Sequence, residues 1–220
     1  MTFSILTFDN KTGVFAAAAA TGSLCVGGWV LRGDIESGFV ASQGTAPSTF
    51  WRDDVLRAMH SGKTAQDAVE TVTSDDPGKG HRQLIALDRS GATHGFTGAD
   101  SVMYAGHLSQ QGLVVAGNML AGPEVLEAMA TTAQNSTDGP DHKMLQVLNA
   151  ARQAGGDNRG LSSATMLILA PDRPPLDLRI DYSDNPIVDL ENLYLRTRAS
   201  PYFDWLSVVP VLENKIRSPL

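Results

Sequence analysis

Thr2 is the residue in this sequence best suited to carry out a reaction by itself. It follows Met1 and opens the segment Thr2-Phe3-Ser4-Ile5. If Met1 is removed, Thr2 carries a hydroxyl nucleophile and a free α-amine, and the pair is a minimal catalyst for acyl transfer. An α-amine has a pKa of about 7.7–8.0, so part of it accepts a proton near neutral pH. The alternative is that Thr2 only begins a strand, where β-branched residues are common.

An asparagine and a glycine-rich loop offer groups that such a nucleophile uses. Asn118 ends a predicted buried strand beside Gly117, where its amide can donate to a developing oxyanion. The alternative is that Asn118 bonds the backbone of a turn. Asp157 and Arg159 lie in the loop 155–160, where backbone N–H groups and one guanidinium can bind a substrate carboxylate. The alternative there is an internal Asp–Arg pair that stiffens the loop.

Three further polar residues are candidates for supporting roles. Ser163 precedes a predicted strand and can assist or orient Thr2, although such a serine can also bond the backbone. Ser4 shares the face of Thr2 on a strand, so it is a candidate for substrate binding. Arg32 is a candidate because a basic neighbour lowers the pKa of an amine.

The sequence predicts no metal and no cofactor. The five histidines contain no pair with metal-ligand spacing on one helix face. Cys25 is the single cysteine, which excludes an internal disulfide and a thiolate cluster. We expect it to be a small buried hydrophobe, and we expect His107 to form structural hydrogen bonds. The loop 155–160 lacks the spacing of a P-loop or a dinucleotide-binding motif.

Composition favours a folded protein of the cytoplasm. The 220 residues are 42% hydrophobic and have a formal net charge of −7, without a basic cluster, so nucleic acid is not an expected partner. The segment 12–31 has no charged residue but is mostly Ala and Gly. We interpret it as buried strand and turn rather than a membrane span or signal peptide.

The elements needed to position these residues alternate between hairpins and helix pairs. Strands are predicted at 2–8, 14–20, 29–43 with a turn at 33–34, 83–87, 92–97, 113–117, 164–169 and, near a sheet edge, 176–183. Helices are predicted from 48 or 49 to about 61, from 64, from 123, from 141, from 186 to about 198, and from 201. Hairpins favour antiparallel sheets. Two such sheets face to face, with helices outside both, give an α+β four-layer α-β-β-α sandwich.

Several segments together are similar to a known family. They are Thr2-Phe3-Ser4-Ile5, Phe96-Thr97-Gly98-Ala99-Asp100, Ala105-Gly106-His107, Ala116-Gly117-Asn118-Met119-Leu120, the loop 155–160 with Ser162-Ser163-Ala164, and the segment 176–181. The chain resembles the domain-of-unknown-function family 1028 from about 2 to 195. That family looks like a member of the N-terminal nucleophile (Ntn) hydrolases, which implies the same four-layer fold. We expect one domain, 1–220, with a C-terminal helical extension from about 196.

These observations favour a hydrolase that cleaves an amide C–N bond in a small molecule or short peptide with Thr2. The competing hypothesis is a catalytically inactive relative that binds a ligand or supports assembly. A third is a hydrolase with an internal nucleophile, Ser163 or Cys25. We expect no membrane partner and a homo-oligomer, for which the aromatic residues Tyr202, Phe203 and Trp205 offer a contact unless they close the core.

Overall fold

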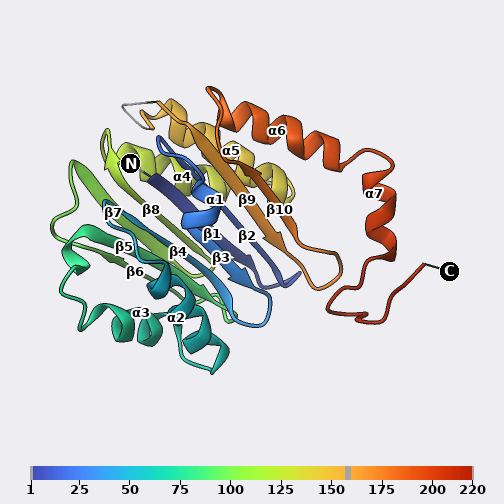
Figure 1. The fold of residues 1–220 in the computed structure, drawn as a ribbon, viewed down its shortest axis with the longest axis horizontal. Coiled ribbons are helices and arrows are strands. Elements are labelled where there is room, and N and C mark those ends of the chain that lie inside the picture. The colour runs from blue at the N-terminus through green and yellow to red at the C-terminus, as the bar shows by residue number, and fades with distance from the viewer. Residues whose placement is uncertain (1, 157–159, 220) are drawn as a thin grey trace.

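The fold is described from a computed structural model, which describes residues 2–156 and 160–219. Within these ranges the strands form two antiparallel sheets (Figure 1). The larger sheet has the order β10-β9-β2-β1-β8-β7, with β1 Thr2–Asp9, β2 Val14–Thr21, β7 Tyr104–Gln110, β8 Leu113–Leu120, β9 Ser163–Leu169 and β10 Leu176–Ile180. The smaller sheet has the order β3-β4-β5-β6, with β3 Leu31–Asp34, β4 Gly38–Gly44, β5 Arg82–Asp88 and β6 Thr93–Thr97.

Helices cover the outer face of each sheet. The larger sheet carries α4 Glu124–Asn135, α5 Pro140–Gln153 and α6 Pro186–Thr197. The smaller sheet carries α2 Thr49–His60 and α3 Ala65–Thr73. Short helices α1 Val26–Trp29 and α7 Tyr202–Trp205 complete the described helical segments, with 3-10 turns at Lys79–His81 and Leu206–Val208.

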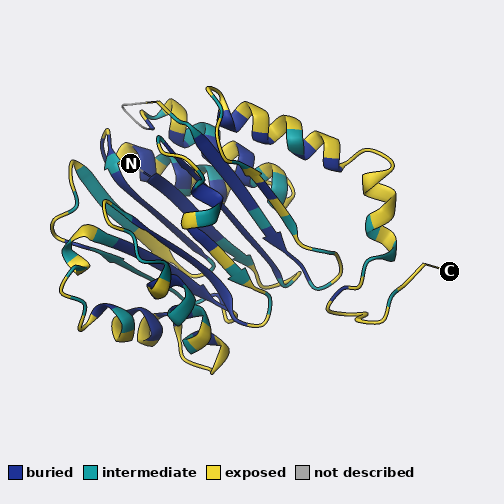
Figure 2. Ribbon diagram, in the orientation of Figure 1, coloured by how far each residue is buried: buried dark blue, intermediate teal, exposed yellow. Residues whose placement is uncertain are grey.

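Three layers of apolar side chains hold the four layers together. One core lies between the larger sheet and its helices, a second between the two sheets, and a third between the smaller sheet and α2 and α3. Figure 2 shows the central strands buried along most of their length, with exposed residues on the outer helices. The predicted α-β-β-α sandwich is therefore confirmed.

Strand β1 divides its side chains between two of these cores. Phe3 and Ile5 face the helices, whereas Leu6 and Phe8 face the smaller sheet. Because successive side chains alternate, Thr2 and Ser4 also face the smaller sheet. The chemistry-bearing start of β1 is therefore enclosed between the two sheets.

Strand β2 explains the run of five alanines. Alanine favours helix by propensity, but every residue of β2 is buried in the middle of the larger sheet. Ala16, Ala18 and Ala20 face the helices, while Ala17 and Ala19 face the smaller sheet. Small side chains on both faces allow both neighbouring layers to approach, so packing outweighs propensity. The interpretation of 12–31 as buried strand and turn holds for β2, but the segment also contains the short helix α1 Val26–Trp29 and the exposed residues Leu24 and Trp29. No helix in the described ranges is long and apolar enough to span a membrane.

Two predicted boundaries were wrong and one strand was missed. The strand predicted from 29 begins at Leu31, because Trp29 is the last residue of α1, and the turn lies at 35–37 instead of 33–34. Strand β7 was not predicted, since its half-exposed edge position gives it a weak apolar pattern. The edge position predicted for β10 is confirmed.

The C-terminal segment lies beside the sandwich rather than within it. In Figure 1, α7 and the tail after it project from the end of α6. Tyr202, Phe203 and Trp205 are exposed on α7, so they do not close the core. Val211 is buried, and the Glu213 N–H donates to the Pro171 carbonyl at 3.1 Å.

We expect Ala18→Leu to lower the free energy of unfolding by about 1–3 kcal/mol, because the added methyl groups overpack the contact between β2 and its helices. Denaturant unfolding measures the change. Ala199→Leu, at an exposed position, is the matched control and should shift the midpoint little. Equal midpoints for the two variants would contradict the tight packing assigned to β2.

Candidate active site

Thr2 is the first residue of β1, and it lies between two neighbouring strands. Its cross-strand partners are Thr21 on β2 and Asn118 on β8. Thr2 is buried, with 8% of its surface exposed, and its Oγ1 donates to Thr21 Oγ1 at 3.1 Å. The hydroxyl is therefore held toward the interior of the sandwich.

A cleft of about 300 Å³ opens onto Thr2. Its polar lining comes from hydroxyl and amide groups, namely Thr2, Thr21, Ser23, Gln43 and Thr45. Its apolar lining is supplied by Leu24, Val26, Trp29, Val30 and Pro47. Among the described lining residues none is charged. The cleft thus combines threonine and serine hydroxyl groups with apolar side chains.

A larger cavity, of about 450 Å³, lies between the β3–β4 turn and the C-terminal tail. The described residues around it include Asp34, Glu36, Arg173 and Lys215, but no Ser, Thr, Cys or His. Volume alone does not identify an active site, and the described lining of this cavity offers no hydroxyl, thiol or imidazole group. We therefore place the candidate site at Thr2.

Two buried glutamines connect the sheets beneath Thr2. Gln43 on β4 and Gln83 on β5 are cross-strand partners. Ser4 Oγ donates to Gln43 Oε1 at 2.8 Å, and Gln43 Nε2 donates to Gln83 Oε1 at 2.7 Å. Gln43 Nε2 also lies 3.4 Å from the Thr2 carbonyl, and Asn118 Nδ2 donates to Gln83 Oε1 at 3.2 Å. Side chains from both sheets therefore share one hydrogen-bonded network.

The network ends at His107. Gln83 Nε2 lies 2.9 Å from Thr97 Oγ1 and 2.8 and 3.0 Å from the carbonyl oxygens of Gly106 and Gly117, so its two N–H groups are shared among three acceptors. Thr97 Oγ1 forms a further hydrogen bond with His107 Nδ1, 2.9 Å away. Burial, with a smaller effect from His94, lowers the pKa of His107 below its usual 6.5. The expected structural role of His107 agrees with these contacts.

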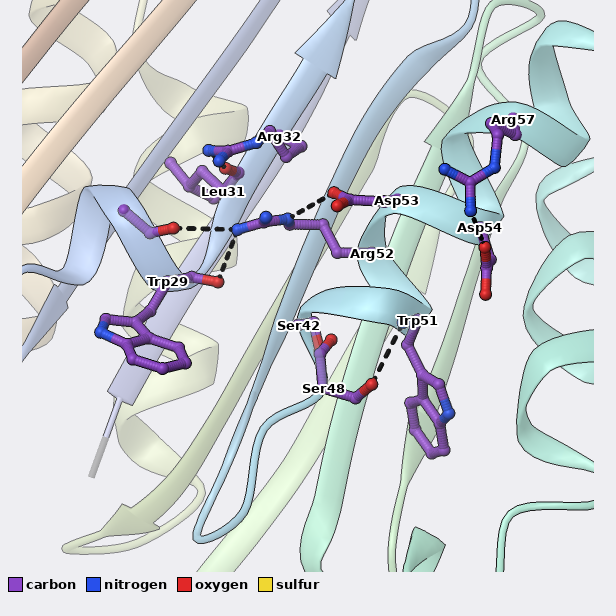
Figure 3. A network of polar contacts seen from close by, with 11 residues as sticks. Trp29, Leu31, Arg32, Ser42, Ser48, Trp51, Arg52, Asp53, Asp54 and Arg57 are labelled. Atoms are coloured by element: carbon purple, nitrogen blue, oxygen red, sulfur yellow. Dashed lines mark hydrogen bonds and ion pairs between the residues drawn. The ribbon is translucent and has the colours of Figure 1, made fainter.

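Helix α1 forms one wall of the cleft, and hydrogen bonds fix both of its ends. Cys25, in the left-handed conformation with φ 60°, turns the chain into this helix. The Val26 N–H donates to Ser163 Oγ at 3.1 Å, while Ser163 Oγ donates to the Ser23 carbonyl at 2.7 Å. At the other end, Arg52 Nη1 donates to the carbonyls of Gly28 and Trp29 at 3.0 and 2.9 Å (Figure 3).

The candidate residues from the sequence do not all gather at this site. Thr2, Ser4 and Asn118 lie together in the network. Ser163 lies behind the wall, wholly buried. Arg32 is exposed on β3 and donates to the carbonyl of its neighbour Leu31, as Figure 3 also shows. Asp157 and Arg159 lie outside the described residues.

Arg32 lies among other charges instead of beside Thr2. Its pKa is lowered by burial, next by Arg52 and, to a smaller extent, by Arg179, while Asp53 and Asp177 act in the opposite direction. None of these residues lines the Thr2 cleft.

Sequence reasoning missed Gln43, Gln83, Thr21 and the wall residue Trp29. The signal for the glutamines was their spacing: Gln83 alternates with inward Ile85 and Leu87, so it occupies an inward position of β5. A polar residue at such a position requires partners. As for metals, no group of three or more His, Cys, Asp or Glu side chains suited to hold an ion occurs within the described ranges.

Comparison with known proteins assigns the chain to a family. The model described as "Family of unknown function (DUF1028)" matches residues 2–190. The chain therefore belongs to this family, and the resemblance noted from its motifs is confirmed.

One solved structure is similar over almost the whole chain. The crystal structure of protein SPO2555 from Silicibacter pomeroyi has 48% sequence identity and a TM-score of 0.94, covering 99% of this chain and 98% of that one. The structure of eukaryotic HslV from Trypanosoma brucei is 11% identical, with a TM-score of 0.49, covering 76% of this chain and 99% of that one. No curated protein matches the sequence.

We expect Gln83→Met to lower the free energy of unfolding by about 2–4 kcal/mol, because it leaves several buried polar partners without a hydrogen bond. Gln66→Met is the control, since Gln66 is exposed and bonds only Glu70 among the described contacts. Chemical denaturation of both variants measures the difference. A loss no larger for Gln83→Met than for Gln66→Met would contradict the network.

We expect the stability contributed by His107 to fall as the pH drops from about 7.5 to 5. The lowered pKa of folded His107 means that the unfolded chain binds the proton first, so stability decreases through pH 6.5 and below. His107→Asn should flatten part of this decrease relative to the wild type. Unfolding midpoints at several pH values measure the slope, and a histidine titration by NMR should give a pKa below 6.5. A pKa above 6.5 would overturn the assignment.

Proposed function

We propose that the protein is a hydrolase of amide C–N bonds in small molecules or short peptides, with Thr2 as nucleophile and base. The observation that carries this proposal is the position of Thr2: a buried residue at the start of the chain whose hydroxyl faces a cleft between two sheets. The four-layer fold is the one that the resemblance to Ntn hydrolases implies. Removal of Met1 is the step that frees the amine.

In the first step the α-amine of Thr2 takes the proton of its hydroxyl, and Oγ1 attacks the substrate carbonyl carbon. The C–O bond forms as the carbonyl oxygen becomes an oxyanion. When the intermediate collapses, the C–N bond breaks and the protonated amine of Thr2 returns the proton to the leaving nitrogen. Water then attacks the ester carbonyl carbon while the amine takes one of its protons. The C–Oγ1 bond breaks, the amine gives that proton to Oγ1, and the product leaves as a carboxylic acid.

The surrounding groups support these steps. The hydrogen bond between Thr2 Oγ1 and Thr21 Oγ1 restricts the nucleophile to one orientation. Asn118, the cross-strand partner of Thr2, uses one amide N–H on Gln83 Oε1. Asn118 is 2% exposed and is not among the described residues that line the cleft, so we assign it to holding Gln83 beneath Thr2 rather than to binding the oxyanion.

The uncharged lining favours the amine in its basic form. A buried amine has a lowered pKa, because burial disfavours the ammonium. No carboxylate lies among the residues described around the cleft. We propose that burial, rather than Arg32, favours the unprotonated amine.

Ser163 is better explained as a positioning residue than as an alternative nucleophile. Its hydroxyl gives its proton to the Ser23 carbonyl and accepts from the Val26 N–H. It is wholly buried and does not line the cleft. We assign it to holding α1 in place.

We expect Thr2→Ala to reduce amide turnover by at least ~10³-fold, while the melting temperature changes by only a few degrees because a single hydroxyl–hydroxyl hydrogen bond, to Thr21, is lost. Turnover is measured on an amide panel, with intact mass used to verify that Met1 is absent. Thr7→Ala, on the same strand and far from the cleft, is the matched control and should keep full activity.

Two results would overturn the proposal. One is full activity in Thr2→Ala. The other is amide hydrolysis by protein in which mass spectrometry shows that Met1 is retained.

A further inference from the structure

We infer that the Thr2 cleft binds an uncharged, apolar acyl group, and that Trp29 with the other residues of the α1 wall selects it. This inference depends on the proposed function for the bond that is cleaved. The preference for the bound group comes from the cleft itself and can be measured without turnover.

The apolar residues that line the cleft come mainly from α1 and the residues beside it, namely Leu24, Val26, Trp29 and Val30. Val26 and Val30 are buried, with 1% and 4% of their surfaces exposed. Leu24 and Trp29 are 56% and 54% exposed, so they lie where the cleft meets solvent. Exposed apolar side chains are in unfavourable contact with water, and a ligand that covers them removes that contact. An aliphatic or aromatic group bound beside Leu24 and Trp29 would therefore be stabilised by burying them.

The described lining residues also disfavour a ligand that carries a charge. A carboxylate or ammonium in the cleft would lose hydration, and none of the described lining residues offers an opposite charge. The hydroxyl and amide groups lie on the side of Thr2, where they suit a carbonyl. The polar and apolar parts of the cleft thus match the two parts of a neutral acyl group.

The volume limits the size of that group. About 300 Å³ is at the lower end of the range for small-molecule sites. It suits a short acyl chain or one amino-acid side chain, not a folded polypeptide. The acyl side is the appropriate occupant because it stays attached to Thr2 after the amine has left, and must be held until water attacks.

The wall is organised before any ligand binds. Arg52 is 3% exposed, and it bonds both carbonyls at the end of α1. Gly27 and Gly28 lie against the side chain of Arg179, where an added Cβ would approach its atoms within 2.8 to 3.0 Å. Ser163 holds the first N–H of the helix. A surface fixed in this way loses little entropy on binding.

The test uses amides of one chromogenic aromatic amine that differ only in the acyl group. The compared groups are hexanoyl, 4-carboxybutanoyl and 5-aminopentanoyl, which are similar in length but neutral, anionic and cationic. Dissociation constants are measured on Thr2→Ala by calorimetry, and kcat/KM on the Met1-free wild type. We expect the hexanoyl amide to bind at least about tenfold more tightly than either charged amide, with the same order in kcat/KM.

Two tryptophans of equal exposure supply a matched pair of variants. Trp29 lines the cleft and is 54% exposed, whereas Trp205 is 55% exposed on α7. We expect Trp29→Ala to weaken hexanoyl-amide binding about tenfold and to raise KM more than it lowers kcat, while Trp205→Ala binds like the parent. Far-ultraviolet circular dichroism verifies that each variant is folded.

The outcomes separate this inference from the proposed function. Equal or tighter binding of a charged amide, or no effect of Trp29→Ala in a folded protein, overturns the inference even if amides are hydrolysed. Selective binding of the hexanoyl amide without any turnover supports the inference and counts against the hydrolase.

Discussion

The central constraint is that the polar groups buried between the two sheets must all find partners. Most of this interface is apolar, but at the start of β1 it contains Ser4, Gln43, Gln83 and Asn118, each at most 2% exposed. Buried amides without hydrogen bonds are costly. Their mutual bonds therefore fix how the smaller sheet sits on the larger one. Thr2 lies two positions before Ser4 and on the same face of β1, so this arrangement also fixes the position of Thr2.

A second set of buried polar contacts fixes the opposite side of the cleft. Arg52 comes from α2, which packs on the outside of the smaller sheet, yet its guanidinium reaches the carbonyls at the end of α1. Ser163 comes from β9 of the larger sheet and bonds the start of the same helix. The short helix is thus tied to both halves of the sandwich. The wall of the cleft is held by Arg52 and Ser163, whose side chains do not line the cleft, whereas Gln43 of the network both lines the cleft and holds its floor.

Features set by local sequence patterns could be predicted, whereas features that depend on contacts between residues far apart in the chain could not. The strand period placed Thr2 and Ser4 on one face, and apolar stripes located the main helices, because these patterns are local. The roles of Ser163 and Arg52 were not predictable, since Ser163 meets Ser23 and Val26 across more than 130 residues of chain. Strand β7 was missed because an edge strand buries too little to show a pattern. The Gln43–Gln83 pair required knowledge of the register between β4 and β5.

The absence of charge among the described cleft residues connects catalysis with specificity. An amine that serves as a base must remain unprotonated near neutral pH, and a buried site without a carboxylate among its described residues favours that form. The same environment penalises a charged group on the ligand. A carboxylate placed in the cleft to bind a cationic substrate would stabilise the ammonium of Thr2 and weaken the base, whereas a guanidinium would lower the pKa of the amine but also attract anions. A neutral, apolar acyl group is the ligand that leaves the base unchanged, so the proposed chemistry and the proposed preference have one physical origin.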